Sequence, residues 1–222
     1  DLNYAKTDVG RIYDALGDPA VGAEEINVLT KSKATPEAIL QAVRDLVGDL
    51  STEDHGVLFF AGHGLQDAEG RFYFATPETD LDDLENSALP WKDIAEALAT
   101  SKARITVLLD ACHSGAADGR AFATNDDAVA GLSSIPANVT ILSASKGREL
   151  SVESAALGGG AFSAGIARVI VSERSKYDMN GNGVLERSEF FSGLKTEMEL
   201  MPDVSQTPWM TNTRLVGDYA LF

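Results

Sequence analysis

Two buried-strand patterns in the sequence end at residues that could perform covalent chemistry. The apolar run ITVLLDACHSG, at 105–115, leads to the only cysteine of the chain, Cys112. A second run, VLFFAGHG at 57–64, ends with His63 between two glycines. Active sites in parallel α/β sheets form at the carboxyl ends of the strands. A thiol and an imidazole delivered there together predict a cysteine nucleophile with its base.

The single cysteine has other possible uses. It cannot form an intrachain disulfide, so it is core filler, a ligand or a nucleophile, and a small buried apolar residue is the plainest alternative. Two further histidines compete as the base. His55 is predicted to lie in an exposed turn before its strand, and His113 is expected to point away from its neighbour Cys112. His63 is preferred because its glycine neighbours allow open access and tight turning.

The charge of the chain limits its partners. The 222 residues have a formal net charge of −16, from 34 acidic and 18 basic residues. This argues against a nucleic-acid partner, because phosphate binding needs a basic footprint. It is compatible with a cationic substrate, with Ca²⁺, or with a solvated acidic surface. No apolar run approaches the ~20 residues of a membrane span. Because the chain starts at Asp1, we expect any leader to be absent already, and localisation is unknown.

Hydrophobic periodicity predicts strands alternating with helices. Strands are expected at 25–29, 56–61, 71–75, 105–109 and 139–144, with a last one within 211–222. Helices are expected at 3–16, 35–50, 87–100, 160–174 and 188–200, the second with Thr35 as its N-cap. The Gly-rich stretch 116–137 is predicted to be a long loop, and loops of this length are usually functional or disordered. The alternation predicts an α/β fold with a mostly parallel sheet.

The two motifs resemble those of the caspase-like cysteine peptidases, most closely the metacaspases and their bacterial relatives. The sequence DACHSG at 110–115 is similar to the D-x-C-H-S-G of metacaspases, and FFAGHG at 59–64 resembles the histidine motif of the family. His63 precedes Cys112 by 49 residues, close to the caspase spacing of about 50. The segments 143–145 and 160–163 resemble the start of the small-subunit portion.

The resemblance implies a caspase-like three-layer sandwich with helices on both faces of the sheet. The whole of 1–222 would be one catalytic domain. It would consist of a large-subunit-like part, 1–115, the loop at 116–137, and a small-subunit-like part, 138–222. The family begins with an apolar strand before the helix that matches 3–16. This chain starts too late to contain that strand, so we expect it to be a fragment, a processed form or a portion of something longer, which would leave room for additional domains.

The resemblance also implies a mechanism. Cys112 would attack a peptide carbonyl as the thiolate, with His63 as acid and base. The N–H groups of Gly64 and Cys112 would stabilise the oxyanion. This chemistry needs no cofactor, and the partner is a peptide or protein substrate. The alternatives are a caspase fold that has lost activity, a non-catalytic calcium-responsive interaction module on the same fold, and another α/β hydrolase or transferase with the same dyad.

The residue two positions before the cysteine lines the primary substrate pocket in the resembling motif. Here it is Asp110, which favours cleavage after Arg or Lys because a carboxylate can pair bidentately with a guanidinium. Metacaspases place a second acid four residues after the serine that matches Ser143. This chain has Gly147 there, and Glu149 could substitute, so Asp110, Ser143 and Glu149 are the expected substrate-binding residues. Alternatively, Asp110 caps the turn after its strand.

The loop at 116–137 contains one basic residue, Arg120. Relatives of caspases are often cut between their large and small portions. Arg120 is therefore a candidate site of autocleavage, and a loop that stays uncut is the alternative.

Residues 178–189, DMNGNGVLERSE, follow the EF-hand pattern. The predicted ligands are Asp178, Asn180, Asn182, the backbone carbonyl of Val184, and Glu189, with Glu186 acting through water. Helices predicted on both sides fit a helix–loop–helix. Against this, EF-hands usually work in pairs and no second loop is present in the sequence. The alternative is an Asn- and Gly-rich connection whose polar side chains cap the neighbouring backbone.

Overall fold

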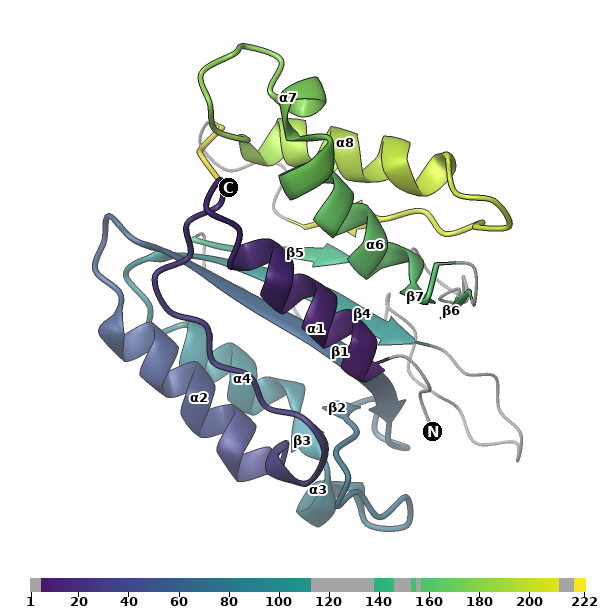
Figure 1. Ribbon diagram of the computed structural model, residues 1–222. Coiled ribbons are helices and arrows are strands. Elements are labelled where there is room, and N and C mark those ends of the chain that lie inside the picture. Colours follow the sequence, from purple (N-terminus) through teal and green to yellow (C-terminus); the bar gives the residue numbers. More distant parts are fainter. Residues whose placement is uncertain (1–4, 113–137, 146–152, 155–156, 212–217) are drawn as a thin grey trace.

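The computed structural model describes residues 5–112, 138–145, 153–154, 157–211 and 218–222. Its centre is a six-stranded sheet in the order β3-β2-β1-β4-β5-β8 (Figure 1). The central strands β1 (His55–Gln66), β4 (Arg104–Cys112) and β5 (Val139–Ser143) are parallel. The outer strands β2 (Phe72–Phe74), β3 (Leu89–Pro90) and β8 (Trp209–Met210) are antiparallel to their neighbours. A separate antiparallel pair is formed by β6 (Glu153–Ser154) and β7 (Gly159–Gly160).

Helices cover both faces of this sheet, so the predicted three-layer α/β fold is confirmed. One layer contains α1 (Ala5–Leu16), α6 (Ala161–Ala167) and α8 (Arg187–Glu199), and the other contains α2 (Pro36–Asp49) and α4 (Trp91–Leu98) (Figure 1). Successive side chains of β4 point to opposite faces of the sheet, so they belong to two separate hydrophobic cores. Leu108 packs with the first layer, whereas Val107 and Leu109 pack with the second. No helix of the described part of the chain is long and apolar enough to cross a membrane.

Short elements connect these layers. They are the 3-10 turn η1 (Lys31–Lys33), α3 (Leu84–Ser87), the π-helical turn η2 (Arg168–Ser172) and α7 (Arg174–Tyr177). The prediction for α2 is confirmed at its N-cap and for part of its apolar stripe. The Thr35 hydroxyl accepts a hydrogen bond from the Ala38 N–H at 3.2 Å. Of the stripe expected at Ile39, Val43, Leu46 and Val47, the two valines are buried and the other two are half-buried.

The helix expected within 87–100, with its start near Pro90, forms as α4 from Trp91, because Pro90 is extended (φ −67°, ψ 133°) and belongs to β3, where it pairs with Tyr73 of β2. Two other predicted elements differ from the structure. Residues 25–29 form no strand, and none of the described strands pairs with them. The helix expected at 160–174 is interrupted by η2 after Ala167. The long loop predicted at 116–137 lies outside the described residues.

Candidate active site

The register of β1 and β4 brings the two predicted reactive positions together. The parallel pairing runs from His55↔Arg104 to His63↔Cys112, so His63 and Cys112 are Cα partners on adjacent strands. Both lie at the carboxyl end of this pairing, where active sites of parallel sheets form. Positions that pair in this way share a face of the sheet.

His63 lies within β1 rather than in a turn after it. The sequence predicts that the strand ends near Ala61, but β1 continues to Gln66 because Gly64, Leu65 and Gln66 pair with β2. The His63 carbonyl accepts a hydrogen bond from the Ala75 N–H at 2.9 Å. The side chain of His63 is half-buried, and Gly64 is buried. The backbone around the imidazole is thus held by strand pairing on two sides.

Asp110 is two positions before Cys112 in β4, with its side chain 3% exposed. Strand alternation puts position 110 on the face covered by α1 and α6, together with Leu108. A Cβ added to Gly160, at the start of α6, would lie 3.2 Å from the Asp110 Oδ2. The carboxylate therefore lies deep between β4 and the beginning of α6, inside the strand rather than in the turn after it.

A second buried carboxylate, that of Asp8 in α1, lies at the same point. Its Oδ2 is also 3.2 Å from the Cβ position of Gly160, so the two Oδ2 atoms are at most twice that distance apart. Asp8 is 4% exposed, and its Oδ1 accepts hydrogen bonds from the Gly160 N–H at 2.9 Å and the Ser163 hydroxyl at 2.5 Å. In Figure 1 the amino end of α1 lies near the arrowheads of β1 and β4.

Asp8 is not among the predicted site residues, although the sequence contains a signal for it. Asp8 is one helical turn before Ile12 and two before Ala15, and all three are buried. A carboxylate on the apolar stripe of an amphipathic helix needs polar partners in the core, which here come from the segment 157–163.

Ser143 and Glu149 are not brought to this point by the described residues. Ser143 pairs with Leu109 in β5, on the face of α2 and α4, and its hydroxyl donates to the Ser145 carbonyl at 3.3 Å. Asp110 faces the other layer. Glu149, Gly147 and Arg120 lie outside the described residues, as does His113. Substrate roles for Ser143 and Glu149 stay predictions.

His55 is at the opposite end of β1, and its predicted place in an exposed turn is wrong. Its Nδ1 is 3.2 Å from the Leu221 carbonyl oxygen and its Nε2 is 2.9 Å from the Thr106 Oγ1. Burial lowers the pKa of His55 to about 4. The C-terminal segment covers the ring, which no local pattern around residue 55 indicates.

The predicted calcium loop connects α7 to α8 and is folded back on its own polar side chains. Asp178 accepts hydrogen bonds from the Asn182 N–H at 3.1 Å and the Gly183 N–H at 2.9 Å. Asn180 Oδ1 accepts from the Asn182 N–H at 2.9 Å, and Asn182 Oδ1 accepts from the Val184 N–H at 2.9 Å. Gly183 has a φ of +86°, which glycine adopts without strain. Oxygens of the first three predicted side-chain ligands therefore face the inside of the loop.

Glu189, the last predicted ligand, is 8% exposed and reaches back over the loop. It accepts hydrogen bonds from the Met179 N–H at 2.9 Å and the Glu186 N–H at 3.2 Å. Burial raises the pKa of the Glu189 carboxyl, and the neighbouring Glu186 adds to this. The hydrogen bond with Glu189 in turn lowers the pKa of Glu186 to about 2. Among the described residues no three His, Cys, Asp or Glu side chains gather as a metal cluster, so oxygens from Asn side chains and backbone would complete the donor set.

The C-terminal segment takes the place of a second loop. The Leu185 N–H donates to the Phe222 carbonyl at 2.7 Å, and the Leu221 N–H donates to the Leu185 carbonyl at 2.8 Å. Leu185 is fully buried. The loop is thus joined to the segment that covers His55, at the end of the sheet opposite to His63.

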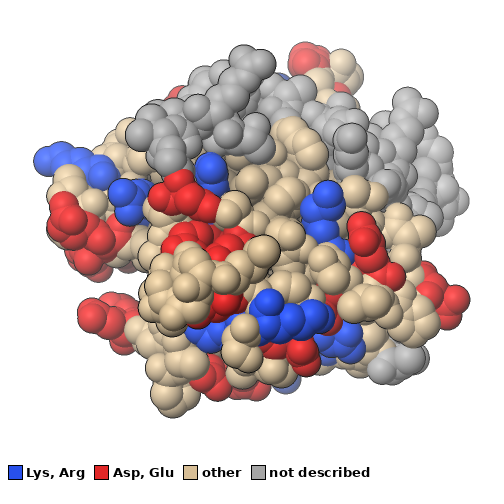
Figure 2. All heavy atoms as spheres, turned by 90° about the horizontal axis from the view of Figure 1, so that it is seen from above, with Lys and Arg blue, Asp and Glu red and all other residues tan. Residues whose placement is uncertain are grey.

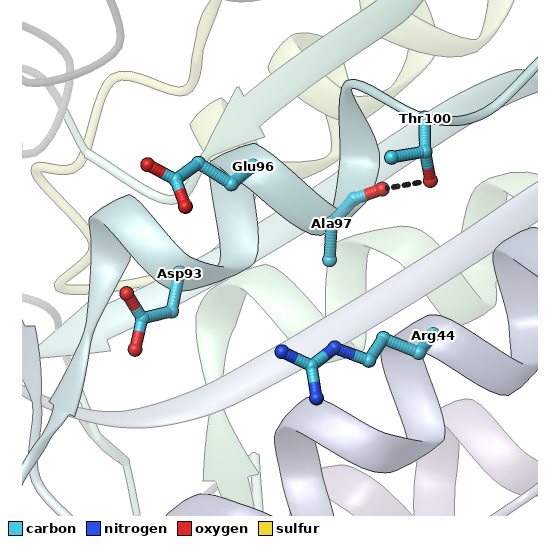
Figure 3. Close-up of a pocket in the computed structure, with 5 residues that line it drawn as sticks. All are labelled: Arg44, Asp93, Glu96, Ala97 and Thr100. Atoms are coloured by element: carbon cyan, nitrogen blue, oxygen red, sulfur yellow. Dashed lines mark hydrogen bonds between the residues drawn. The ribbon is translucent and has the colours of Figure 1, made fainter.

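A surface groove lies between α2 and α4, on the other face of the sheet. It is lined by Arg44, Asp93, Glu96, Ala97 and Thr100, and the Thr100 hydroxyl bonds to the Ala97 carbonyl at 2.8 Å (Figure 3). Its position separates it from His63 and Asp110 by the thickness of the sheet. On the face drawn in Figure 2, Asp and Glu side chains are spread over the surface with Lys and Arg between them, as in a solvated acidic surface.

The fold and the paired strand ends define a three-layer α/β domain with a candidate cysteine–histidine site. The chain belongs to the caspase domain family of cysteine-type peptidases, whose family model matches residues 1–219. The crystal structure of protein GSU0716 from Geobacter sulfurreducens has a similar fold. It is 19% identical with a TM-score of 0.63, and the match covers 95% of this chain and 84% of that chain. No curated protein matches the chain.

Proposed function

We propose that the protein is a cysteine endopeptidase in which Cys112 and His63 form the catalytic dyad. The main support is the register of β1 and β4, which makes these two residues partners at the carboxyl end of the parallel pairing. Membership of the caspase domain family agrees with this assignment. Strand pairing holds the backbone of both positions side by side, and nucleophilic catalysis needs a nucleophile with a base beside it.

In the proposed reaction the Cys112 thiolate attacks the carbonyl carbon of the scissile peptide bond. His63 takes up the thiol proton and then donates it to the amine that leaves, so that an acyl-enzyme forms. A water that loses its proton to His63 next attacks the thioester, and the freed thiolate leaves. The N–H groups of Gly64 and Cys112 are the proposed donors to the oxyanion in both steps. No cofactor takes part.

We propose further that cleavage occurs after Arg or Lys. The support is the convergence of the Asp110 and Asp8 carboxylates at Gly160, both buried and on the face that positions 63 and 112 share. A guanidinium can donate to both carboxylates, and desolvated contacts of this kind are the strong ones. Asp8 then supplies the second acid of the pocket, in place of the acid expected after Ser143.

Hydrolysis of fluorogenic peptides that end in Arg, Lys or Asp tests both proposals. Wild type, Cys112→Ala and His63→Ala are compared with calcium present throughout, and thermal melting shows that each is folded. We expect turnover after Arg and Lys that is lost in both variants. Turnover after Asp alone would refute the pocket and keep the peptidase.

The absence of any turnover would favour the non-catalytic interaction module. The rate of alkylation of Cys112 by iodoacetamide separates these cases. An active site with a lowered thiol pKa reacts faster than a free thiol, whereas a thiol in a binding module reacts no faster.

We also propose that the loop at 178–189 binds Ca²⁺. The inward oxygens of Asp178, Asn180 and Asn182 and the buried carboxylate of Glu189 support this. Hard oxygen donors of this kind suit Ca²⁺. The ion would stabilise the loop and, through Leu185, the C-terminal segment, without touching the proposed dyad.

Calorimetric titration with CaCl₂, with MgCl₂ as the comparison ion, tests the loop. We expect Ca²⁺ binding to wild type and to Glu173→Gln, a matched carboxylate before the loop, and no binding to Glu189→Gln. Binding at one hundred times the dissociation constant would stabilise the fold by about 2.7 kcal/mol. Equal titrations for wild type and Glu189→Gln would contradict the site.

A further inference from the structure

Arg11 joins α1 to the segment that leads into α6. Its Nη1 donates to the Ser163 hydroxyl oxygen at 2.7 Å, and its Nη2 donates to the Leu157 carbonyl at 2.7 Å. Nη1 also lies 3.3 Å from the Asp8 Oδ1. The guanidinium therefore contacts both the carboxylate of Asp8 and the backbone against which that carboxylate packs.

These contacts determine which oxygen of Asp8 faces the proposed pocket. Arg11, Ser163 and the Gly160 N–H all meet Oδ1. The Asp8 Oδ2 lies 3.2 Å from the place that a Cβ on Gly160 would take. The Asp110 Oδ2 lies at the same distance from that place. The preceding residue, Gly159, must also be a glycine. A Cβ at that position would lie 2.5 Å from the Asp8 Oδ1 and 2.9 Å from the Arg11 Nη1.

We propose that Arg11 is a positioning residue of the substrate pocket, which holds Asp8 so that its Oδ2 faces Asp110. This inference rests on the proposed peptidase function. Two buried carboxylates repel each other, and a third charge of opposite sign offsets that repulsion. Arg11 supplies this charge from the side of Oδ1 and leaves Oδ2 for a substrate cation. A lysine can replace it only in part, because it keeps the charge but lacks the planar fork that reaches Ser163 and Leu157 at once.

The test measures kcat and KM for an Arg-ended peptide. We expect Arg11→Met to raise KM by about tenfold, the effect of losing one aligned hydrogen bond to a charged group, while kcat changes less than about twofold. Arg11→Lys should lie between. Arg44→Met, on the far face of the sheet (Figure 3), is the matched control and should leave both constants unchanged. The rate of Cys112 alkylation should be the same in all four proteins.

A double-mutant cycle with Asp8→Asn shows whether Arg11 acts through Asp8. If it does, adding Arg11→Met to Asp8→Asn changes KM less than about twofold further, because coupled residues are not additive. Additive effects, or an unchanged KM in Arg11→Met, would overturn the proposal. So would a parallel loss of kcat, alkylation rate and melting temperature, which would show a structural role only. If wild type and Arg44→Met hydrolyse no peptide, the peptidase proposal fails and this one with it.

Discussion

Acidification is expected to destabilise the protein through His55. The imidazole is held between the Leu221 carbonyl and the Thr106 hydroxyl, at 3.2 and 2.9 Å. Burial is the main reason that its pKa falls from 6.5 to about 4. The hydrogen bond to Leu221 opposes this effect, and the positive charge of Arg104 adds to it. The folded protein therefore keeps His55 neutral over a pH range in which an exposed histidine is charged.

The sign and size of the effect follow from these two pKa values. Between pH 6.5 and 4 the unfolded chain binds a proton at His55 that the folded protein does not bind. The free energy of unfolding therefore falls as the pH falls through this range. The whole difference in pKa corresponds to about 3 kcal/mol, of which about 2 kcal/mol is already lost at pH 5. Above about pH 7 His55 contributes no further dependence on pH.

Urea unfolding of wild type and His55→Phe between pH 7.5 and 5 measures this loss. The phenyl ring can still pack against Tyr219, which meets His55 edge-to-face with centroids 6.0 Å apart. His55→Phe should be less stable at pH 7.5, because both hydrogen bonds are lost. Between pH 7.5 and 5 the free energy of unfolding should fall by about 2 kcal/mol less in His55→Phe than in wild type. The contribution of the carboxyl groups is the same in both proteins, so it cancels in this difference. Equal dependence on pH in the two proteins would refute a buried neutral imidazole.

Three further predictions concern the pocket, the calcium loop and the long loop. Gly159→Ala should raise KM for Arg-ended peptides, because its Cβ would lie 2.5 Å from the Asp8 Oδ1; an unchanged KM would argue against Asp8 in the pocket. Leu185→Ala should cost about 2–5 kcal/mol of unfolding free energy in urea, because the side chain is fully buried; a loss below about 1 kcal/mol would show that its core packing matters little. Wild type should cleave itself after Arg120 and Cys112→Ala should not; an intact mass that stays constant in wild type would contradict this.

The predictions that succeeded depend on local patterns. Thr35, Pro36 and the stripe of Val43 and Val47 lie within one helix, and the helix forms as expected. The prediction that failed at 25–29 shows the limit of this reasoning. A strand needs a partner, and an apolar run without one stays irregular. His55 fails for the same reason, because the segment that buries it is at the other end of the chain.

The sequence by itself determined the three buried strands that form the centre of the sheet, β1, β4 and β5, because their apolar runs, bounded by glycine and polar residues, are local patterns. It also indicated His63 and Cys112 as the candidate dyad, from their motifs. Only the tertiary structure decided that these two are register partners and that Asp8 lies beside Asp110. Asp8 is bonded to Gly160 across 152 residues of chain. Such contacts join residues that are far apart in the sequence, through strand pairing and the packing of α1 on α6, whereas a local periodicity indicates only which face of an element is buried.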